Sequence, residues 1–472
     1  MQKADGKIIS RKQFVNQAGS LLALSLIDFN LNEKNIAEEV RKPSKIRVRN
    51  VDLNFEREPL IPYHFKGSFV TELWQTVTRL ESESGVSKIG LGTQSVLWCD
   101  ARVFAEHSES AGNALMYSMS EKALQIIKTS SFSNPMELLD QLLPEVYDYG
   151  KKITGHADLR NTFALNSLVC VDNAAWLLYA AENNIQSFDE MIPPAYRLGL
   201  SFRHSKVASI PAFSAATNVE KIKAAADEGH FIMKLKIGSP GTQKEMLEKD
   251  MAFLSSVHST LGKYRTPHSK NGKIPYCLDS NGRYEQKDSF LRFLDHAKKI
   301  GAFDQIALIE EPFAETNEIY VGDMGVLIAA DESAATVEDA GRRIEQGYKT
   351  IVLKPVAKTL SMTLKIARLA FEKKIPCFCA DLTVNPILVD WNKCVAARLS
   401  PLPNIDVGLL ETNGHQYYKN WGKMITYHPQ LNAPWTQMQN GIFPIDKSFY
   451  DESGGIFQAS SHYEQLFEKN ER

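Results

Sequence analysis

Five short apolar runs in the second half of the chain each end in charged residues, and this feature most constrains the fold. The run 231–238 carries Lys234 and Lys236, which the alternation of side chains along a strand places on one face. Two cations on one face of an apolar strand are costly unless anionic groups lie opposite them. Three further runs end in acids, and a fifth, 350–355, ends in Lys354. We interpret these five charged strand ends as parts of one site.

The acids that end the three acidic runs are Asp279, Glu310 and Asp331. Three converging carboxylates cannot all stay ionised in a partly buried pocket unless a cation joins them. Oxygen ligands with no softer donor nearby favour Mg²⁺ over zinc. The alternative, that each acid only stabilises the start of the following helix, explains a single acid more readily than three in series between lysines. Lysines beside such an ion would have a lowered pKa, as a general base requires.

From residue 206 onward, strand and helix patterns alternate, and the pattern predicts eight strands with helices between them. This rhythm favours an α/β fold, a (β/α)₈-type barrel, whose functional groups stand at the carboxyl ends of the strands. A doubly wound open sheet is the competitor, but no Gly-x-Gly-x-x-Gly follows an early strand. The predicted helices cover residues 218–228, 241–262, 287–300, 336–346, 359–373 and 385–399.

Residues 45–200 read differently, because three strand patterns precede three helix patterns, which predicts an α+β capping domain. The strands are expected at 45–55, 69–80 and 88–92, with loops at 58–67 and 93–98. The barrel is expected to span residues 201–413. The segment 414–472 is expected to return to the capping domain. The predicted helices of this domain are 105–128, 135–152 and 162–183.

Residues 1–44 are interpreted as a leader and a polar linker. Basic residues at 11 and 12 followed by an apolar segment at 18–27 are similar to a degenerate twin-arginine export signal, although lysine replaces the second arginine. The competing interpretation is a cytoplasmic leader, so the location is expected to be either cytoplasmic or periplasmic.

A net charge of −2 gives no reason to expect nucleic acid as a partner. No apolar run approaches the roughly 18 residues of a membrane span. The six cysteines are scattered, which favours buried, reduced thiols over disulfides or a zinc site. The expected partner is therefore a small molecule, and a homo-oligomer is left open.

The motifs at the strand ends resemble, in this order, the enolase superfamily, and most closely its muconate-lactonizing and dipeptide-epimerase branch, the mandelate racemase/muconate lactonizing enzyme family. The resemblance covers about residues 45–420. The matching motifs are Lys234-Leu-Lys236, Asp279-Ser-Asn281, Glu310-Glu-Pro312, Ala330-Asp-Glu-Ser333 and Lys354.

This resemblance implies that Asp279, Glu310 and Asp331 bind Mg²⁺, which receives a substrate carboxylate. It also implies that Lys236 and Lys354 face each other across the substrate α-carbon. An α-proton is then removed through an enediolate, whose charge the ion stabilises. One lysine takes the proton and the other returns it, which racemises or epimerises an amino-acid derivative or a dipeptide-like acid. Lys234 is expected to support Lys236 electrostatically.

Other residues are candidates for substrate contact. Asn281 belongs to a motif, whereas Asp406 and Glu411 stand where dipeptide epimerases are expected to show Asp-x-Asp. His64 is a candidate beside its plainer interpretation as a loop-packing residue, and Trp98 in the second loop is expected to be a packing residue rather than a stacking platform. Lys358 departs from the family's usual glycines and is expected to be a solvated lysine at a helix start, with contact to a second anionic group as the alternative.

Removal of the α-proton does not determine which reaction follows. The same two lysines permit cycloisomerisation or dehydration by β-elimination, so a cycloisomerase or dehydratase is the alternative enzyme. An alternative of another class is a non-catalytic carboxylate-binding barrel. That alternative has no use for bases on opposite faces of the ligand.

Overall fold

The structure is a computed structural model that describes residues 45–65 and 68–468, without the side chains of His64 and Phe65. The predicted leader and linker at residues 1–44 lie outside the described residues. The described residues all belong to one structural unit.

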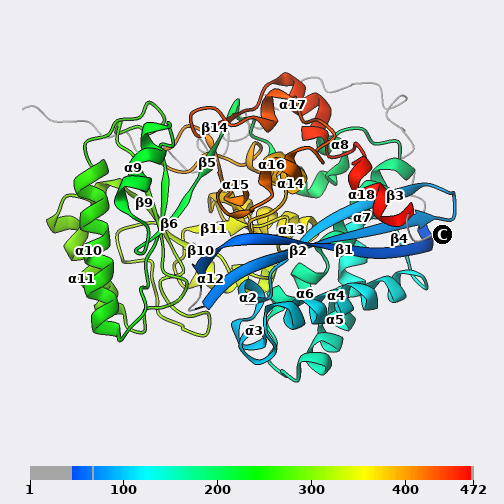
Figure 1. The fold of residues 1–472 in the computed structure, drawn as a ribbon, viewed down its shortest axis with the longest axis horizontal. Coiled ribbons are helices and arrows are strands. Elements are labelled where there is room, and N and C mark those ends of the chain that lie inside the picture. Colours follow the sequence, from blue (N-terminus) through cyan, green and yellow to red (C-terminus); the bar gives the residue numbers. More distant parts are fainter. Residues whose placement is uncertain (1–44, 66–67, 469–472) are drawn as a thin grey trace, which may run out of the picture. The chain divides into compact units, whose positions relative to one another are not determined.

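The first part of this unit is built on a four-stranded antiparallel sheet in the order β3-β2-β1-β4. Helices α4 and α5 lie along one side of the long β1–β2 hairpin (Figure 1). The strands are β1 (Ile46–Phe65), β2 (Ser68–Ser82), β3 (Ser87–Gln94) and β4 (Ser131–Phe132).

The β1 strand continues ten residues beyond the predicted end at residue 55, so the loop predicted at 58–67 is wrong. Pro59 and Pro62 favoured a loop, because proline cannot donate to a strand ladder. The pairing with β2 shifts register between Pro59 and Tyr63, and this irregularity accommodates both prolines. The longer strand carries Tyr63 to the mouth of the barrel.

The helices of the capping domain pack on this sheet, most closely α7 on β3. A Cβ atom on Gly90 would lie 2.1 Å from the backbone nitrogen of Ala174, so only glycine allows this approach. The helices are α2 (Val96–Cys99), α3 (Ala101–His107), α4 (Glu109–Ile127), α5 (Pro135–Thr154), α6 (Asn161–Ser167), α7 (Val169–Glu182), α8 (Phe188–Met191) and the 3₁₀ helix η1 (Pro194–Leu200).

The second part is a ten-stranded sheet in which eight segments are parallel neighbours in chain order, from β6 to β13. The strands are β5 (Lys206–Ile210), β6 (Ala212–Ser214), β7 (Met233–Lys236), β8 (Tyr276–Asp279), β9 (Ile306–Glu310), β10 (Ile328–Ala330), β11 (Thr350–Leu353), β12 (Cys377–Ala380), β13 (Gly408–Glu411) and β14 (Ile442–Pro444).

The sheet closes on itself at Pro211, the single residue between β5 and β6. β5 pairs in parallel with β13, whereas β6 pairs in parallel with β7. The two segments therefore act as one barrel strand that serves the last neighbour and the first. The predicted fold class, a (β/α)₈-type barrel preceded by an α+β capping domain, is confirmed.

Helices follow the strands as the sequence pattern predicted, and α10 and α11 lie side by side (Figure 1). Several begin at a side-chain cap, such as Thr242 and Thr336, each in a reciprocal capping box. The helices are α9 (Val219–Asp227), α10 (Gln243–Leu261), α11 (Lys287–Lys299), α12 (Val337–Glu345), α13 (Leu360–Glu372), α14 (Pro386–Ala396) and the 3₁₀ helix η2 (Phe303–Gln305).

The carboxyl-terminal segment contacts both parts. β14 pairs antiparallel with β5, and Leu60 of β1 forms an isolated bridge with Tyr418. Asn54 donates a 3.0 Å hydrogen bond from Nδ2 to the carbonyl of Leu466. The segment contains α15 (Gly414–Tyr417), α16 (Trp421–Ile425), α17 (Lys447–Glu452), α18 (Ser461–Glu468) and the 3₁₀ helices η3 (Pro434–Thr436) and η4 (Ser453–Gly455).

All six cysteines are free and buried, as predicted. Among residues 45–65 and 68–468, no single helix has the length and hydropathy of a membrane span. Only α6 and α7 together, bent by 48° from each other, reach those criteria.

Candidate active site

A pocket opens at the carboxyl ends of the barrel strands, the edge at which such barrels carry their functional groups. Charged side chains form one part of its wall, and the capping domain contributes Tyr63, Ser95 and Trp98. The charged and amide side chains that line it are Lys234, Lys236, Asn281, Asp331, Glu332, Lys354, Asp381, Glu411 and Asn413.

Lys234 lies at the centre of the buried acids. Its ammonium is 2.7 Å from Glu310 Oε2, 2.6 Å from Glu411 Oε2 and 3.0 Å from Asp279 Oδ2. Strand register explains the placement, because Lys234 pairs with Cys277, whose side chain belongs to the apolar cluster inside the barrel. The side chain of Lys234 is only 2% exposed, so three acids serve a single buried cation.

Lys236 lies two residues further along the same strand and on the same face. It donates hydrogen bonds of 2.5 Å to Asp279 Oδ2 and 3.2 Å to Asn281 Oδ1. Its side chain is 23% exposed and lines the pocket. The amine therefore combines access to a ligand with a fixed acid partner.

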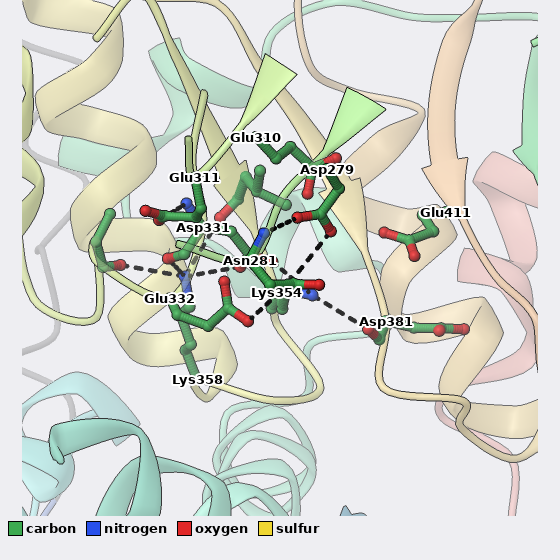
Figure 2. A network of polar contacts seen from close by, with 12 residues as sticks. Asp279, Asn281, Glu310, Glu311, Asp331, Glu332, Lys354, Lys358, Asp381 and Glu411 are labelled. Carbon is green, nitrogen blue, oxygen red and sulfur yellow. Dashed lines mark hydrogen bonds and ion pairs between the residues drawn. The ribbon is translucent and has the colours of Figure 1, made fainter. Parts of the chain in front are cut away.

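Lys354 follows β11 and contributes the second amine of the pocket. It is 3.0 Å from Asp331 Oδ2 and donates a 3.3 Å hydrogen bond to the carbonyl of Asp381. Figure 2 shows Lys354 lying between the cluster of acids and Asp381. The Trp98 ring, brought by α2 of the capping domain, has its centroid 5.4 Å from the Lys354 ammonium, within the range of a cation–π contact.

The charges in the cluster shift one another's pKa values. Burial raises the pKa of Glu310 to about 8 against the opposing effect of Lys234, and the negative charges of Asp279, Glu411 and Asp331 add to the rise. Burial also favours a higher pKa for Asp279, but the charges of Lys234 and Lys236 outweigh it and lower that pKa to about 2. The lysines therefore do not fully neutralise the negative charge of the acids.

Both buried lysines are held in the charged form. Burial alone would lower the pKa of Lys234, but the charges of Asp279 and Glu310 raise it well above its ordinary value. The pKa of Lys354 is raised in the same way, because the charge of Asp331 outweighs the effect of burial.

The donor set fits a hard divalent cation by its chemistry. In the part of the chain that the structure describes, no three Asp, Glu, His or Cys side chains are arranged around a common point as metal ligands. The Lys234 ammonium lies where Asp279 and Glu310 converge. However, the donors are oxygen atoms, and the buried Asp331 Oδ1 accepts no hydrogen bond. Buried, mutually repelling carboxylates with an unsatisfied oxygen are suited to Mg²⁺.

The other predicted substrate contacts fall in different places. Asn281 and Glu411 line the pocket. Asp406 does not, because it precedes β13, is exposed, and has its backbone N–H 3.3 Å from the carbonyl of His268, away from the carboxyl ends of the strands. The side chain of His64 lies outside the described residues.

Lys358 departs from its predicted solvated position. Its side chain is 1% exposed, and its ammonium reaches the carbonyls of Asp331, Ala334 and Val352. The prediction of a solvated lysine is wrong, because these carbonyls, which belong to other segments of the barrel, provide the acceptors that water would otherwise supply.

Two acids of the pocket wall were not singled out in the sequence. Asp381 directly follows β12, so the rule of charged strand ends that identified Asp279 would have found it. Burial raises the pKa of Asp381 to about 7. Glu332 is the acid beside Asp331, and its carboxylate accepts a 3.4 Å hydrogen bond from Asn281.

A barrel with an antiparallel capping sheet, and with lysines and acids at its strand ends, defines an enolase-like class of protein. Residues 218–418 match the family described as "Enolase C-terminal domain-like". This match covers a little under half of the chain, and the predicted resemblance to the enolase superfamily is confirmed.

Solved structures match most of the chain in fold. A dipeptide epimerase from Enterococcus faecalis V583, complexed with Mg and the dipeptide L-Leu-L-Tyr, is 17% identical, with a TM-score of 0.56 over 79% of this chain and 92% of that one. The L-Ala-D/L-Glu epimerase from Bacillus subtilis, in a substrate-liganded complex, is 14% identical, with a TM-score of 0.58 over 79% and 91%.

A mandelate racemase/muconate lactonizing protein from Herpetosiphon aurantiacus is 12% identical, with a TM-score of 0.58 over 85% of this chain and 96% of that one. At these identities the matches show the fold alone. No curated protein matches the chain.

Proposed function

We propose that the protein removes the proton α to the carboxylate of a small-molecule substrate and returns it on the opposite face. The proposed activity is racemisation or epimerisation of an amino-acid derivative or a dipeptide-like acid. The observation that carries the proposal is the presence of two lysine amines, Lys236 and Lys354, in the wall of one pocket.

The topology of the barrel supports this pairing. Lys236 ends β7 and Lys354 follows β11, and these are the second and sixth strands in the closed order that starts with β5 and β6. In a ring of eight strands, the second and the sixth lie on opposite sides. A substrate held between the two amines therefore presents one face of its α-carbon to each.

Asp279, Glu310 and Asp331 are proposed to hold Mg²⁺. When bound, Mg²⁺ supplies positive charge that stabilises the negative charge developing on the substrate carboxylate. Asn281, which contacts Lys236, and Glu411, which contacts Lys234, complete the polar wall around the substrate.

The lysines have distinct tasks in this proposal. Lys236 takes the α-proton from one enantiomer and Lys354 takes it from the other, each amine returning a proton to the face it contacts. The positive charge of Mg²⁺ at Asp331 would offset the charge that raises the pKa of Lys354, as a base requires. Lys234 contacts Glu310 and Glu411 rather than open solvent, so its proposed task is to hold the acids in place.

Proton exchange in D₂O tests the proposal directly. The protein is incubated with Mg²⁺ and panels of N-acyl amino acids, dipeptides and sugar acids, and deuterium at the α-carbon is measured by NMR. We expect label and inversion with at least one class. Products of ring closure or water loss would favour the cycloisomerase or dehydratase, and no exchange with any class would favour the non-catalytic carboxylate-binding barrel.

Single-lysine variants separate the two tasks. Lys236→Ala and Lys354→Ala should each abolish racemisation, while each retains exchange of the one enantiomer whose proton faces the remaining lysine. Lys206→Ala is the control, because Lys206 is an exposed lysine at the start of β5, at the other end of the barrel. Full racemase activity in either active-site variant would contradict the two-base assignment.

A further inference from the structure

Lys358 is a buried lysine whose ammonium contacts backbone rather than forming a close ion pair. Its Nζ donates to the carbonyls of Asp331 at 2.5 Å, Ala334 at 3.2 Å and Val352 at 3.5 Å. The nearest carboxylate oxygen, Asp331 Oδ1, is 3.5 Å away. An ammonium has three N–H donors, so these contacts use its whole capacity.

The segment that receives these hydrogen bonds carries a proposed metal ligand. Residues 331–334 form a turn after β10 in which the Ala334 N–H donates to the carbonyl of Asp331 at 3.1 Å. From the other side, Glu311 Oε1 accepts from the Asp331 N–H at 2.5 Å and from the Ser333 N–H at 3.0 Å. Glu311 thus accepts hydrogen bonds from N–H groups of the turn, and Lys358 donates hydrogen bonds to its carbonyls.

The backbone around Lys358 connects this turn to the proposed base. The Lys358 N–H donates to the carbonyl of Lys354 at 2.8 Å, so the two lysines are one turn apart. Their ammonium groups contact different oxygens of one carboxylate, Lys354 at Oδ2 of Asp331 and Lys358 on the side of Oδ1. Figure 2 shows Lys358 and Lys354 together beside Asp331.

We infer that Lys358 is a positioning residue that holds the 331–334 turn so that Asp331 presents its carboxylate to Mg²⁺ and to Lys354. The metal part of this inference rests on the proposed function. The ordering of the turn does not.

Two effects of Lys358 on metal binding oppose each other. Its positive charge repels a divalent cation, so removal of the charge alone would tighten binding. Its hydrogen bonds join the carbonyls of Asp331, Ala334 and Val352, and their loss would let the turn rearrange. We infer that the hydrogen bonds affect metal binding more than the charge does, because the Lys358 ammonium is closer to the Asp331 carbonyl than to the Asp331 carboxylate.

The test uses the full chain with Lys358→Met, which keeps the side chain out to Cε and removes every donor. We expect Mg²⁺ affinity, measured by isothermal titration calorimetry, to fall about tenfold or more. We also expect faster hydrogen exchange of the amides at 331–334. Lys393→Met is the control for the loss of a buried lysine elsewhere, because Lys393 is equally buried, donates to the carbonyl of Trp435 and forms an ion pair with Asp390, outside the pocket.

A second variant separates the effect of the hydrogen bonds from the effect of the charge. It also replaces Lys358→Met in the test if that variant does not fold. Lys358→Gln removes the charge but keeps two N–H donors, so we expect a smaller loss of affinity and less exchange than in Lys358→Met. Binding as tight as or tighter than wild type in either folded variant would overturn the inference.

The exchange measurement distinguishes this inference from the proposed function. If wild-type protein binds no Mg²⁺, the proposed function fails, and exchange at 331–334 alone decides the inference. Unchanged protection of these amides in the variants would then overturn it, and faster exchange limited to the turn would support it.

Discussion

The two lysines proposed as bases differ in how firmly their surroundings hold them. The side chain of Lys354 is 4% exposed and packs between Asp331 and the Trp98 ring. The side chain of Lys236 is 23% exposed and rests on Asp279 and Asn281. The capping domain therefore contacts the Lys354 amine through the Trp98 ring.

Trp98→Leu should slow the two directions of proton transfer unequally. Loss of a cation–π contact of about 0.5–2 kcal/mol would reduce catalysis through Lys354 by roughly 2- to 30-fold. Exchange rates of the separate enantiomers in D₂O measure the effect. Trp74→Leu is the control, because Trp74 stacks on Phe55 within the capping domain. An equal loss for both enantiomers would argue against a specific contact with Lys354.

Charged residues at strand ends could be predicted, whereas the burial of Lys358 could not. Strand ends are local features of sequence, and the barrel brings them together. The partners of Lys358 are carbonyls contributed by other segments of the barrel, and backbone acceptors leave no trace in a residue pattern. Asp406 shows the reverse error, since a sequence position near β13 does not reveal at which end of the strand the side chain stands.

At the scale of elements, the contact between α7 and α13 joins the capping domain to the barrel. Asp172 of α7 accepts a 3.1 Å hydrogen bond from the Ser361 N–H at the start of α13, and Trp176 Nε1 donates to the Ser361 hydroxyl at 3.0 Å. Burial raises the pKa of Asp172 to about 6, although the hydrogen bonds from Ser361 oppose the rise.

The contribution of Asp172 to the stability of the folded protein should fall as pH rises. The ordinary pKa of Asp172 is 3.8 and the folded value is about 6. Between these values the folded state binds more protons than the unfolded state, so this group's contribution to stability falls with rising pH. The change is on the order of 3 kcal/mol by pH 7.

Asp172→Asn removes this titration and isolates it. The free energy of unfolding of the variant minus that of wild type should increase from pH 4 to pH 7, as measured by urea unfolding at each pH. Other titrating groups cancel in the difference. A difference that does not change with pH would show that Asp172 has an ordinary pKa in the folded protein.

The β1 strand shows, at the scale of elements, where prediction from local sequence fails. Its first half alternates clearly, but the prolines in its second half mimic a loop signal. The pairing with β2 and the bridge from Leu60 to Tyr418 hold this half extended. Tyr63, near its end, packs on the Tyr417 ring with centroids 4.3 Å apart and lines the pocket.

At the scale of the whole molecule, the order of the barrel strands follows from sequence, but their closure does not. Parallel strands joined by helices pair with their sequence neighbours, which makes the order from β6 to β13 predictable. Closure depends on the split at Pro211, and the antiparallel addition of β14 joins residues more than 200 positions apart. Neither has a local signal.

The buried acids link the stability of the whole molecule to Mg²⁺. A ligand that binds only the folded state stabilises it by about 2.7 kcal/mol at a concentration of one hundred times its Kd. We therefore expect millimolar Mg²⁺ to raise the Tm of the wild-type protein and a chelator to reverse the rise. An unchanged Tm across this range would contradict the proposed metal site.

Glu310→Gln should separate two effects of the acid cluster, the loss of stability without Mg²⁺ and the gain of stability with it. Glu310 is buried beside Asp279 and Glu411, and its pKa is raised to about 8, so keeping a carboxyl group there costs stability in the absence of the ion. The variant should consequently be as stable as wild type or more stable without Mg²⁺, yet show no rise in Tm with it. Asp295→Asn, at an acid whose side chain is 72% exposed on α11, should keep the wild-type response. If Glu310→Gln instead retains the full rise in Tm with Mg²⁺, the ion binds elsewhere, because a ligand whose charge has been removed cannot account for an unchanged affinity.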